Sequence, residues 1–177
     1  MATEWTAPSV ARVEPDLIAG ERQSLEQWLE FHRETLLMKC AGLSAEQLKA
    51  RPVPPSSLSL LGLVRHMTEV EQWWFRMHAG TEQIEFAYST EPYETADFEE
   101  IDGADAEADL DRFRSELAAA RAAVMEKGLD DVVASRGHHA DKTRDIRWIY
   151  LHMIEEYARH NGHADLIREC IDGVVGN

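Results

Sequence analysis

The stretch RWIYLHMIEEYARHNGHADLIRE, residues 147–169, decides the fold prediction. Its apolar residues recur every three or four positions, which is the period of an α-helix with one buried face. Three histidines and two adjacent glutamates interrupt these apolar positions. A projection at about 100° per residue centres the apolar face on His160 and places Glu156 about 40° to one side. We therefore predict a helix over about 143–172 that carries ionisable groups on its buried side.

The remaining ionisable residues of this helix fall on two different sides. His163 projects about 60° from His160 on the side of Glu156, and His152 about 80° away. Glu155 points towards the opposite face, so the adjacent glutamates have different surroundings. A buried carboxylate without a partner costs several kcal/mol, so Glu156 needs a cation, a hydrogen-bond network or water.

Three further segments have helical periodicity and are each followed by a glycine. The sequence predicts these helices over about 15–41, 58–79 and 104–127. Ser44 and Gln47 have the spacing of a capping box for a short helical turn. Residues 81–103 lack a helical period and are predicted to form a long connection with a short pair of strands. The segment DDVVASRGHHADK is predicted to be a polar link.

Four long helical segments with little strand signal indicate an all-α fold, a four-helix bundle with long connections between the helices. A chain of 177 residues suits one domain, which we place at 1–177. The sequence leaves the oligomeric state open, and a homodimer is compatible with it.

The charge and the cysteine content narrow the classes of function. The formal net charge of −15 repels phosphate backbones and anionic lipids, so nucleic-acid and membrane partners are not expected. No apolar run has the length of a signal peptide or a membrane span. The two cysteines, Cys40 and Cys170, have no metal-binding or redox spacing, which favours a reducing cytoplasm.

Glu156 and His160 are four residues apart, so their side chains can reach one metal ion. A third ligand must come from another helix, and His66 lies in an apolar stripe of the segment 58–79. Three nitrogen and oxygen ligands with one open position suit a catalytic divalent metal, with zinc preferred over nickel or iron. We predict His66, Glu156 and His160 as the metal ligands.

Each of these residues also has a structural interpretation. His66 alone is compatible with a hydrogen-bonded core histidine, and Glu156 with His160 is compatible with an ion pair on a helix surface. His163 fits a fourth ligand, a partner behind the ligands or a proton carrier, and His152 a cavity wall or such a partner. Glu69 is either a hydrogen-bond acceptor behind His66 or an exposed helix acid.

Other polar and aromatic residues give weaker signals. His138 and His139 lie in the polar link, where a solvated loop is expected rather than a metal site. Trp73 and Trp74 are expected to serve packing, with one of them lining a pocket. Cys40 has no activating neighbour in the sequence and is expected to be an inert core thiol.

Two motifs together resemble a known superfamily. GLVRHMTEVEQWWFR at 62–76 and the stretch at 147–169 resemble the DinB-like (YfiT-like) superfamily, in particular its actinobacterial-type branch. The resemblance extends over about 15–173. It implies a four-helix bundle with one metal ligand on the second helix and two on the last.

The resemblance assigns the ligand positions to His66, Glu156 and His160. The pair Glu156 and His160 forms the ExxxH pattern that is similar to the metal-binding domain of mycothiol-dependent maleylpyruvate isomerase, where many relatives have HxxxH. His163 stands where other members often have glutamine, so its role as ligand or proton carrier stays open. Bundles of this superfamily are often homodimers.

The resemblance further implies metal-assisted chemistry on a low-molecular-weight thiol such as mycothiol. The first functional hypothesis is a thiol S-transferase that joins this thiol to an electrophilic substrate. The second is a metal-dependent hydrolase that uses bound water in place of the thiol. The third is a non-enzymatic stress protein that binds a metal or a small molecule.

Overall fold

Helices make up most of the structure, a computed structural model that describes residues 5–90, 95–136 and 142–176. In chain order the elements are α1 (Glu21–Cys40), α2 (Ala45–Lys49), α3 (Leu60–Glu71), the π-helix η1 (Gln72–Ala79), α4 (Ala96–Glu99), α5 (Ala106–Val124), β1 (Val132–Ala134), β2 (Thr143–Asp145) and α6 (Ile146–Asp172). Within the described ranges, the strands form one two-stranded antiparallel sheet. The chain is therefore mostly helical, as its sequence predicts.

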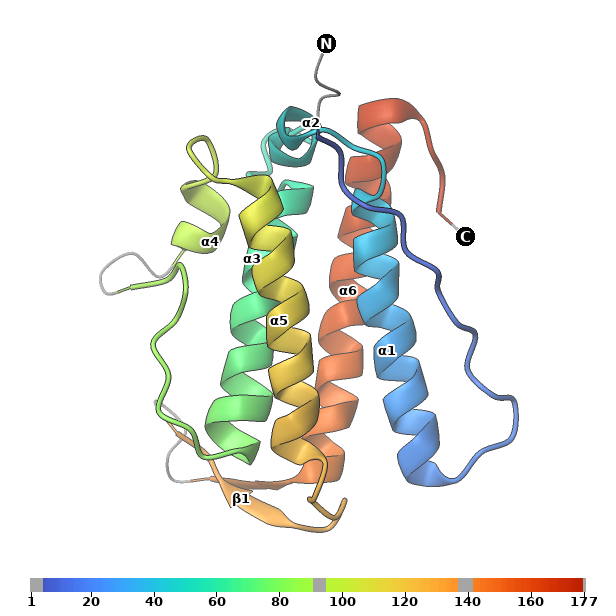
Figure 1. The fold of residues 1–177 in the computed structure, drawn as a ribbon, viewed down its shortest axis with the longest axis vertical. Helices are drawn as coiled ribbons and strands as arrows, with labels where there is room; N and C mark the ends of the chain where they lie inside the picture. The colour runs from blue at the N-terminus through green and yellow to red at the C-terminus, as the bar shows by residue number, and fades with distance from the viewer. Residues whose placement is uncertain (1–4, 91–94, 137–141, 177) are drawn as a thin grey trace.

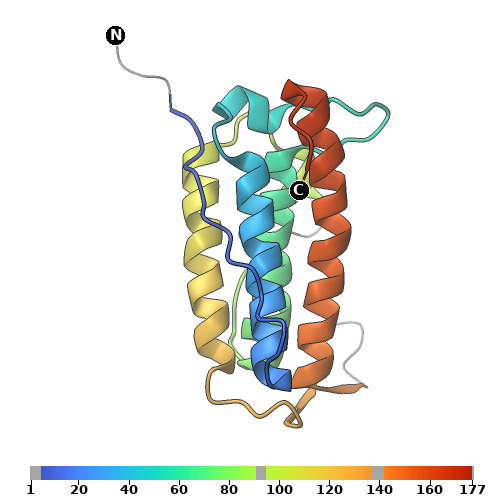
Figure 2. The same cartoon turned by 90° about the vertical axis from the view of Figure 1, so that its right-hand side faces the viewer.

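The long helices run side by side along the long axis of the molecule (Figure 1). α1 packs against α6, and α3 packs against both α5 and α6. η1 continues α3 and extends its contact with α5. A view from the side shows the segment before α1 running back along that helix (Figure 2). This arrangement places α3 and α6, the two helices with the predicted ligands, next to each other.

Side-chain caps set the beginnings of α2, α3, α5 and α6. Ser59 Oγ accepts a hydrogen bond from the Gly62 amide at 3.0 Å, and Asp105 Oδ1 accepts one from Ala108 at 3.1 Å. Such bonds satisfy amides that have no partner inside the first turn. Ser44 and Gln47 form the predicted capping box at the start of α2.

The helix predicted over 15–41 begins later, at Glu21. The preceding residues are held by side chains of α1: Asp16 Oδ2 accepts hydrogen bonds from Gln23 and Gln27. Leu17 and Ile18 are almost fully exposed, so a helical turn there would bury no apolar surface.

The described strands lie outside the segment in which a strand pair was predicted, and residues 91–94 of that segment are not among the described residues. The described part of 81–103 contains α4 and no strand, whereas the polar link forms β1 and pairs with β2, with Val133 opposite Arg144. α6 accordingly starts at Ile146 instead of 143. Asp145 explains this start because its side chain accepts the Trp148 amide at 2.7 Å and caps the helix.

The π-helix η1 changes which tryptophan faces α6. A π-turn holds more residues than an α-turn, so residues after Gln72 fall behind the α-helical phase. The α-helical period of the sequence places Trp73 on the His66 face. In the structure Trp74 faces α6, with its ring 4.8 Å from the His152 ring.

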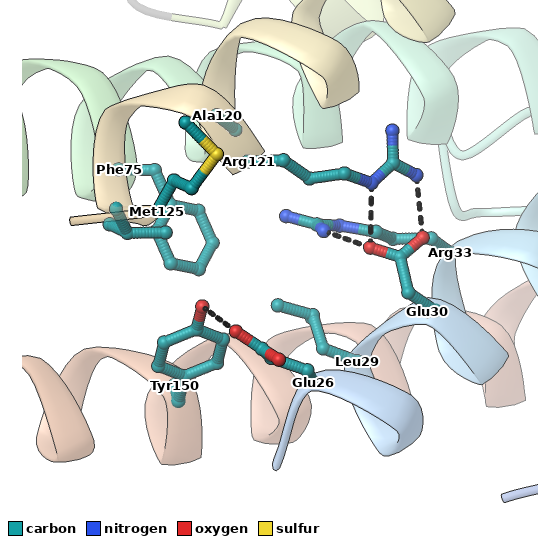
Figure 3. Close-up of a pocket in the computed structure, with 10 residues that line it drawn as sticks. Glu26, Leu29, Glu30, Arg33, Phe75, Ala120, Arg121, Met125 and Tyr150 are labelled. Atoms are coloured by element: carbon teal, nitrogen blue, oxygen red, sulfur yellow. Dashed lines mark hydrogen bonds and ion pairs between the residues drawn. The ribbon is translucent and has the colours of Figure 1, made fainter. Parts of the chain in front are cut away.

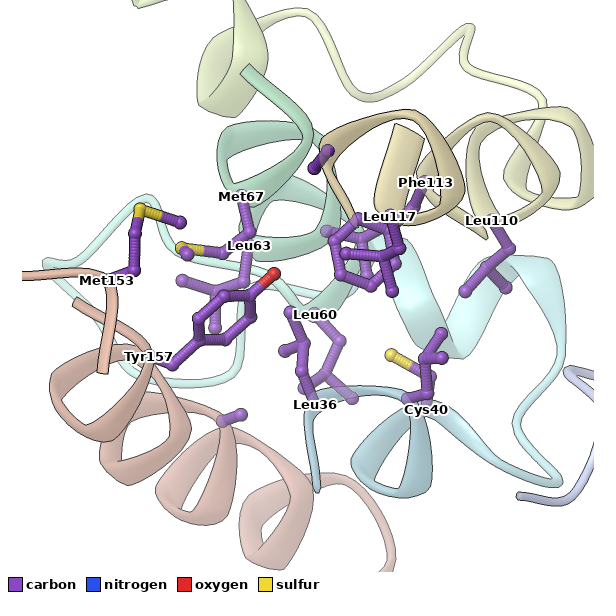
Figure 4. Packing of buried hydrophobic residues seen from close by; sticks show 14 of the residues in the cluster. Leu36, Cys40, Leu60, Leu63, Met67, Leu110, Phe113, Leu117, Met153 and Tyr157 are labelled. Carbon is purple, nitrogen blue, oxygen red and sulfur yellow. The ribbon is translucent and has the colours of Figure 1, made fainter. Parts of the chain in front are cut away.

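The core lies between α1, α3, α5 and α6 (Figure 4). Leu36 and Cys40 from α1 belong to the same buried cluster as Leu63 and Met67 from α3. Phe113 of α5 and Met153 of α6 complete the same cluster. Packing of this kind fixes how α3 and α6 sit relative to each other.

A buried ion pair crosses this core. The Arg33 guanidinium donates two hydrogen bonds to the Glu71 carboxylate at 2.7 and 2.6 Å. The Tyr157 hydroxyl donates a third to the same carboxylate at 2.7 Å. Glu71 is completely buried, so these three bonds replace the water that its charge loses. The network joins α1, α3 and α6. Its member Tyr157 is the residue after the candidate ligand Glu156.

Candidate metal centre

The three predicted ligands come together between α3 and α6. One nitrogen or oxygen atom from each of His66, Glu156 and His160 lies within 4.8 Å of the other two. Glu156 Oε2 is 3.5 Å from His160 Nε2, as the shared face of α6 requires. The His66 and His160 rings lie 4.8 Å apart, centroid to centroid. The structure thus brings together residues that are 90 positions apart in the sequence.

Asp97 of α4 fixes the orientation of His66. Its Oδ2 lies 2.8 Å from His66 Nδ1, and its side chain is 6% exposed. The Phe98 ring covers the same imidazole at 4.8 Å. A carboxylate at Nδ1 holds the proton there and leaves Nε2 as the nitrogen available to a metal. Asp97 was not predicted from the sequence, because its acid-rich segment has no period that connects it to α3.

The acceptor role suggested for Glu69 was wrong, and so was the exposed alternative. Glu69 is buried, and its carboxylate accepts hydrogen bonds from the Tyr88 and Ser89 amides at 2.6 and 2.8 Å. It therefore holds the connection between η1 and α4 against α3, and Asp97 takes the position behind His66.

His160 is held in a largely dry environment. Burial, followed by the nearby His66 and His163, lowers the pKa of His160 to about 4. Its side chain is 12% exposed, whereas those of His66 and Glu156 are each 27% exposed. A neutral imidazole keeps the lone pair that a metal requires. The two more exposed side chains leave the site accessible from solvent.

His163 and His152 flank the three ligands. The His163 ring lies 5.4 Å from that of His160, and its buried Nδ1 has no hydrogen-bond partner among the described residues. His152 Nε2 lies 3.4 Å from Glu156 Oε1, the carboxylate oxygen that does not face His160. The His152 ring stacks on Trp148 at 4.8 Å. His152 therefore contacts Glu156 on the side away from His160. This is one of the two roles predicted for it, that of a partner behind a ligand.

This donor set fits a divalent metal. Ligand atoms about 2 Å from a tetrahedral zinc ion are about 3.3 Å apart, close to the 3.5 Å between Glu156 and His160. One ligand atom of His66 lies within 4.8 Å of those of Glu156 and His160, so a single ion between them could contact all three residues. The buried His160 Nδ1 has no protein partner in the described chain. Two imidazoles and one carboxylate leave a fourth position for a small molecule.

Other predicted features lie away from this centre. Cys40 is fully buried, and burial raises the pKa of its thiol to about 12, so it supplies no thiolate. His138 and His139 lie outside the described residues. A cavity of about 360 Å³ between α1, η1, α5 and α6 contains none of the three ligands (Figure 3). Its charged groups are engaged with one another: Glu30 pairs with both Arg33 and Arg121.

A model of a known protein family matches most of the chain. The family model described as Mycothiol-S-transferase matches residues 24–173, well over half of the chain. The chain belongs to the Mycothiol-S-transferase family. This family is DinB-like, so the superfamily predicted from the two motifs is confirmed. A search of curated proteins finds no match.

The Mycothiol-S-transferase match spans every element that builds the candidate centre. α3, α4 and α6 all lie inside the matched residues.

Among the helices of the described residues, none combines the length and the apolar character needed to cross a bilayer.

Asp97→Ala is expected to weaken zinc binding by this member of the Mycothiol-S-transferase family about 10- to 100-fold, because His66 loses the acceptor that orients it. Competition with a chromophoric chelator measures the change. Asp102→Ala, which removes a 95%-exposed acid from the same connection, serves as the matched control. Equal zinc affinity in the Asp97 variant and the wild type would show that Asp97 does not support the site.

Proposed function

We propose that the chain is a metal-dependent thiol S-transferase, built as one DinB-like four-helix bundle over residues 1–177. The convergence of His66, Glu156 and His160 within 4.8 Å is the observation that carries the proposal. The family match adds the class of reaction, since its description names a mycothiol transferase. A low-molecular-weight thiol such as mycothiol is the donor substrate, and an electrophilic small molecule is the acceptor.

Zinc is the metal that we propose for this centre. Two imidazoles with one carboxylate and an open position are a common ligand set of catalytic zinc. Nickel and iron accept similar ligands and are the alternatives to be tested by metal exchange. A divalent metal bound at these three residues would hold the donor thiol as thiolate at neutral pH.

The residues of the chain supply position and proton transfer. His66 is held by Asp97 and Glu156 by His152, so both ligands keep one orientation during the reaction. The thiol sulfur forms a bond to the electrophilic carbon of the acceptor. The leaving group departs with the electron pair of the bond that breaks. His163 accepts the proton of the thiol at Nδ1, the buried nitrogen that has no partner among the described residues.

The cytoplasm is the compartment that fits this proposal. Low-molecular-weight thiols stay reduced there and remain available as donors. The buried Cys40 and the exposed Cys170 form no disulfide, which agrees with a reducing environment.

Turnover of a model electrophile tests the proposed function. Zinc-loaded protein is mixed with a chloro-dinitrobenzene with and without mycothiol, and separately with a nitrophenyl ester in the absence of thiol. A rate above background that requires both mycothiol and metal supports the transferase. Hydrolysis of the ester without thiol would instead support the function of a metal-dependent hydrolase. No turnover of either substrate would leave a binding protein without enzymatic activity.

A further inference from the structure

A basic pocket lies at the start of α6, beyond the candidate metal centre. The cavity has a volume of about 440 Å³ and is lined by Lys142, Thr143, Arg144, Asp145 and Trp148, which we call the β2–α6 pocket. Trp148 is 39% exposed, so its ring offers apolar surface beside two cations. None of the three candidate ligands lines this pocket.

The two cations of the pocket have no carboxylate partner within the described residues. The ion pairs of that part of the chain involve neither Lys142 nor Arg144, although the net charge is −15. The one carboxylate of the pocket, Asp145, accepts the Trp148 amide and lies 3.9 Å from Arg147. An anion that enters the pocket therefore meets locally positive charge on an otherwise acidic protein.

The Arg144 side chain is preorganised to bind such an anion. Its guanidinium donates a hydrogen bond to Ser135 Oγ. The same group lies 4.6 Å from the centroid of Trp148 and 5.2 Å from that of Trp74. Stacking on two indoles restricts the side chain, so less conformational freedom is lost when it binds a ligand. The guanidinium donors that remain suit the two oxygens of a carboxylate.

A row of contacting side chains along α6 connects the pocket to the candidate metal ligands. Arg144 directly precedes the helix, and Trp148, His152, Glu156 and His160 follow in α6 at steps of four residues, so the row turns by about 40° per step. Contacts of 4.6, 4.8 and 3.4 Å connect Arg144 to Trp148, Trp148 to His152 and His152 to Glu156. Trp148 and Glu156 are about 12 Å apart along the helix, at about 1.5 Å per residue. One elongated molecule of two rings can span this distance.

We propose that the β2–α6 pocket binds the anionic end of the acceptor substrate. The acceptor is a planar aromatic acid, and its electrophilic carbon lies at the other end of the molecule, beside the metal centre. Arg144 and Lys142 bind the carboxylate, and the exposed part of Trp148 contacts the ring. The assignment of this ligand as acceptor rests on the proposed transferase function, whereas the binding of an aromatic acid does not.

Binding is tested with unreactive ligands, so that the result does not depend on catalysis. The probes are a methylbiphenyl carboxylate and the corresponding carboxamide, measured by calorimetry on metal-free and zinc-loaded protein. The wild type is expected to bind the carboxylate at least about tenfold more tightly than the amide. Arg144→Ala and Lys142→Ala are each expected to reduce this preference, and Lys142→Ala does so at an exposed position with no packing role.

Arg114→Ala is the matched control, because it removes one positive charge from α5 and leaves the pocket intact. It should keep the wild-type preference for the carboxylate. Equal affinity of the wild type for the acid and the amide would overturn the proposal. So would an unchanged preference in both pocket variants.

Turnover tests the link to the acceptor. The substrate is a biphenyl with a carboxylate at one end and a chloromethyl group at the other. Mycothiol sulfur forms the new bond to the methylene carbon, and chloride leaves with the electron pair of the carbon–chlorine bond. Arg144→Ala should raise KM for this acid at least about tenfold and reduce the difference in KM between the acid and its amide. Binding of the carboxylate probe without turnover of either substrate would contradict the transferase function and still support the pocket as a binding site for an aromatic acid.

Discussion

Glu71→Ala is expected to lower the free energy of unfolding by about 3–5 kcal/mol, because it leaves the buried Arg33 charge without its main partner. Arg33 would retain only Glu30, which lies 2.6 Å from its Nη1 and is one-third exposed. The Tyr157 hydroxyl would also lose its acceptor inside the core. Urea unfolding followed by circular dichroism measures the change, and an m-value equal to that of the wild type keeps the comparison valid.

A double variant separates the buried charge from the shape of the core. Arg33→Met combined with Glu71→Leu removes both charges and keeps apolar volume between α1 and α3. It should be more stable than Glu71→Ala, since well-packed apolar residues often replace a buried ion pair without loss. A loss below about 1 kcal/mol in Glu71→Ala would mean that the Arg33 charge has water or another partner in solution.

His160→Ala is expected to reduce mycothiol-dependent turnover more than about 100-fold. Loss of a residue that only supports a ligand typically reduces metal affinity about 10- to 100-fold, and loss of a ligand should exceed this. Initial rates at fixed zinc and mycothiol concentrations measure the effect. Because His160 lies in the interior between α3 and α6, circular dichroism must show that the variant is still folded.

Variants of two other histidines are compared with His160→Ala, and His32→Gln is the control. His32→Gln removes a half-buried imidazole of α1 whose Nδ1 lies 3.4 Å from Asn161 Nδ2 and which is outside the candidate ligand cluster, and it should keep the wild-type rate. His163→Gln should retain the metal and lose rate, because the proposed proton acceptor is gone. A rate in His160→Ala that equals the rate in His32→Gln would contradict a role of His160 in the reaction.

The sequence predicts the helices and the ligand cluster because both depend on local spacing. The four-residue step from Glu156 to His160 places the two side chains on one face of any α-helix, whatever the rest of the fold does. His66 was found because a polar residue on an apolar stripe stands out against its neighbours. The candidate site could therefore be assembled from two helices before their packing was known.

The support of the site depends on contacts between distant segments, so the sequence does not reveal it. Asp97 reaches His66 from α4, a helix of only four residues that has too few positions for a detectable period. Glu69 has the sequence appearance of a surface acid and is buried because residues after η1 fold back over it. Neither role follows from the helical positions of these residues alone.

The π-helix and the hairpin were missed for physical reasons as well. The residues of η1 also fit an α-helical period, so the sequence pattern does not reveal the wider turn that places Trp74 rather than Trp73 against α6. β1 and β2 have three residues each, too few for the alternation that identifies a strand. These two features contribute to the aromatic and basic surface beside the candidate metal centre, and that surface could therefore not be predicted from the sequence.

Zinc titration of metal-free protein tests the central claim, that His66, Glu156 and His160 together hold one divalent metal. The wild type, His66→Ala and Glu156→Gln are each titrated against a chromophoric chelator, with circular dichroism as the check on folding. We expect one tightly bound zinc per chain in the wild type and loss of tight binding in both variants. A folded wild type that binds no zinc, or variants that bind it as tightly as the wild type, would show that these three residues are not the metal ligands.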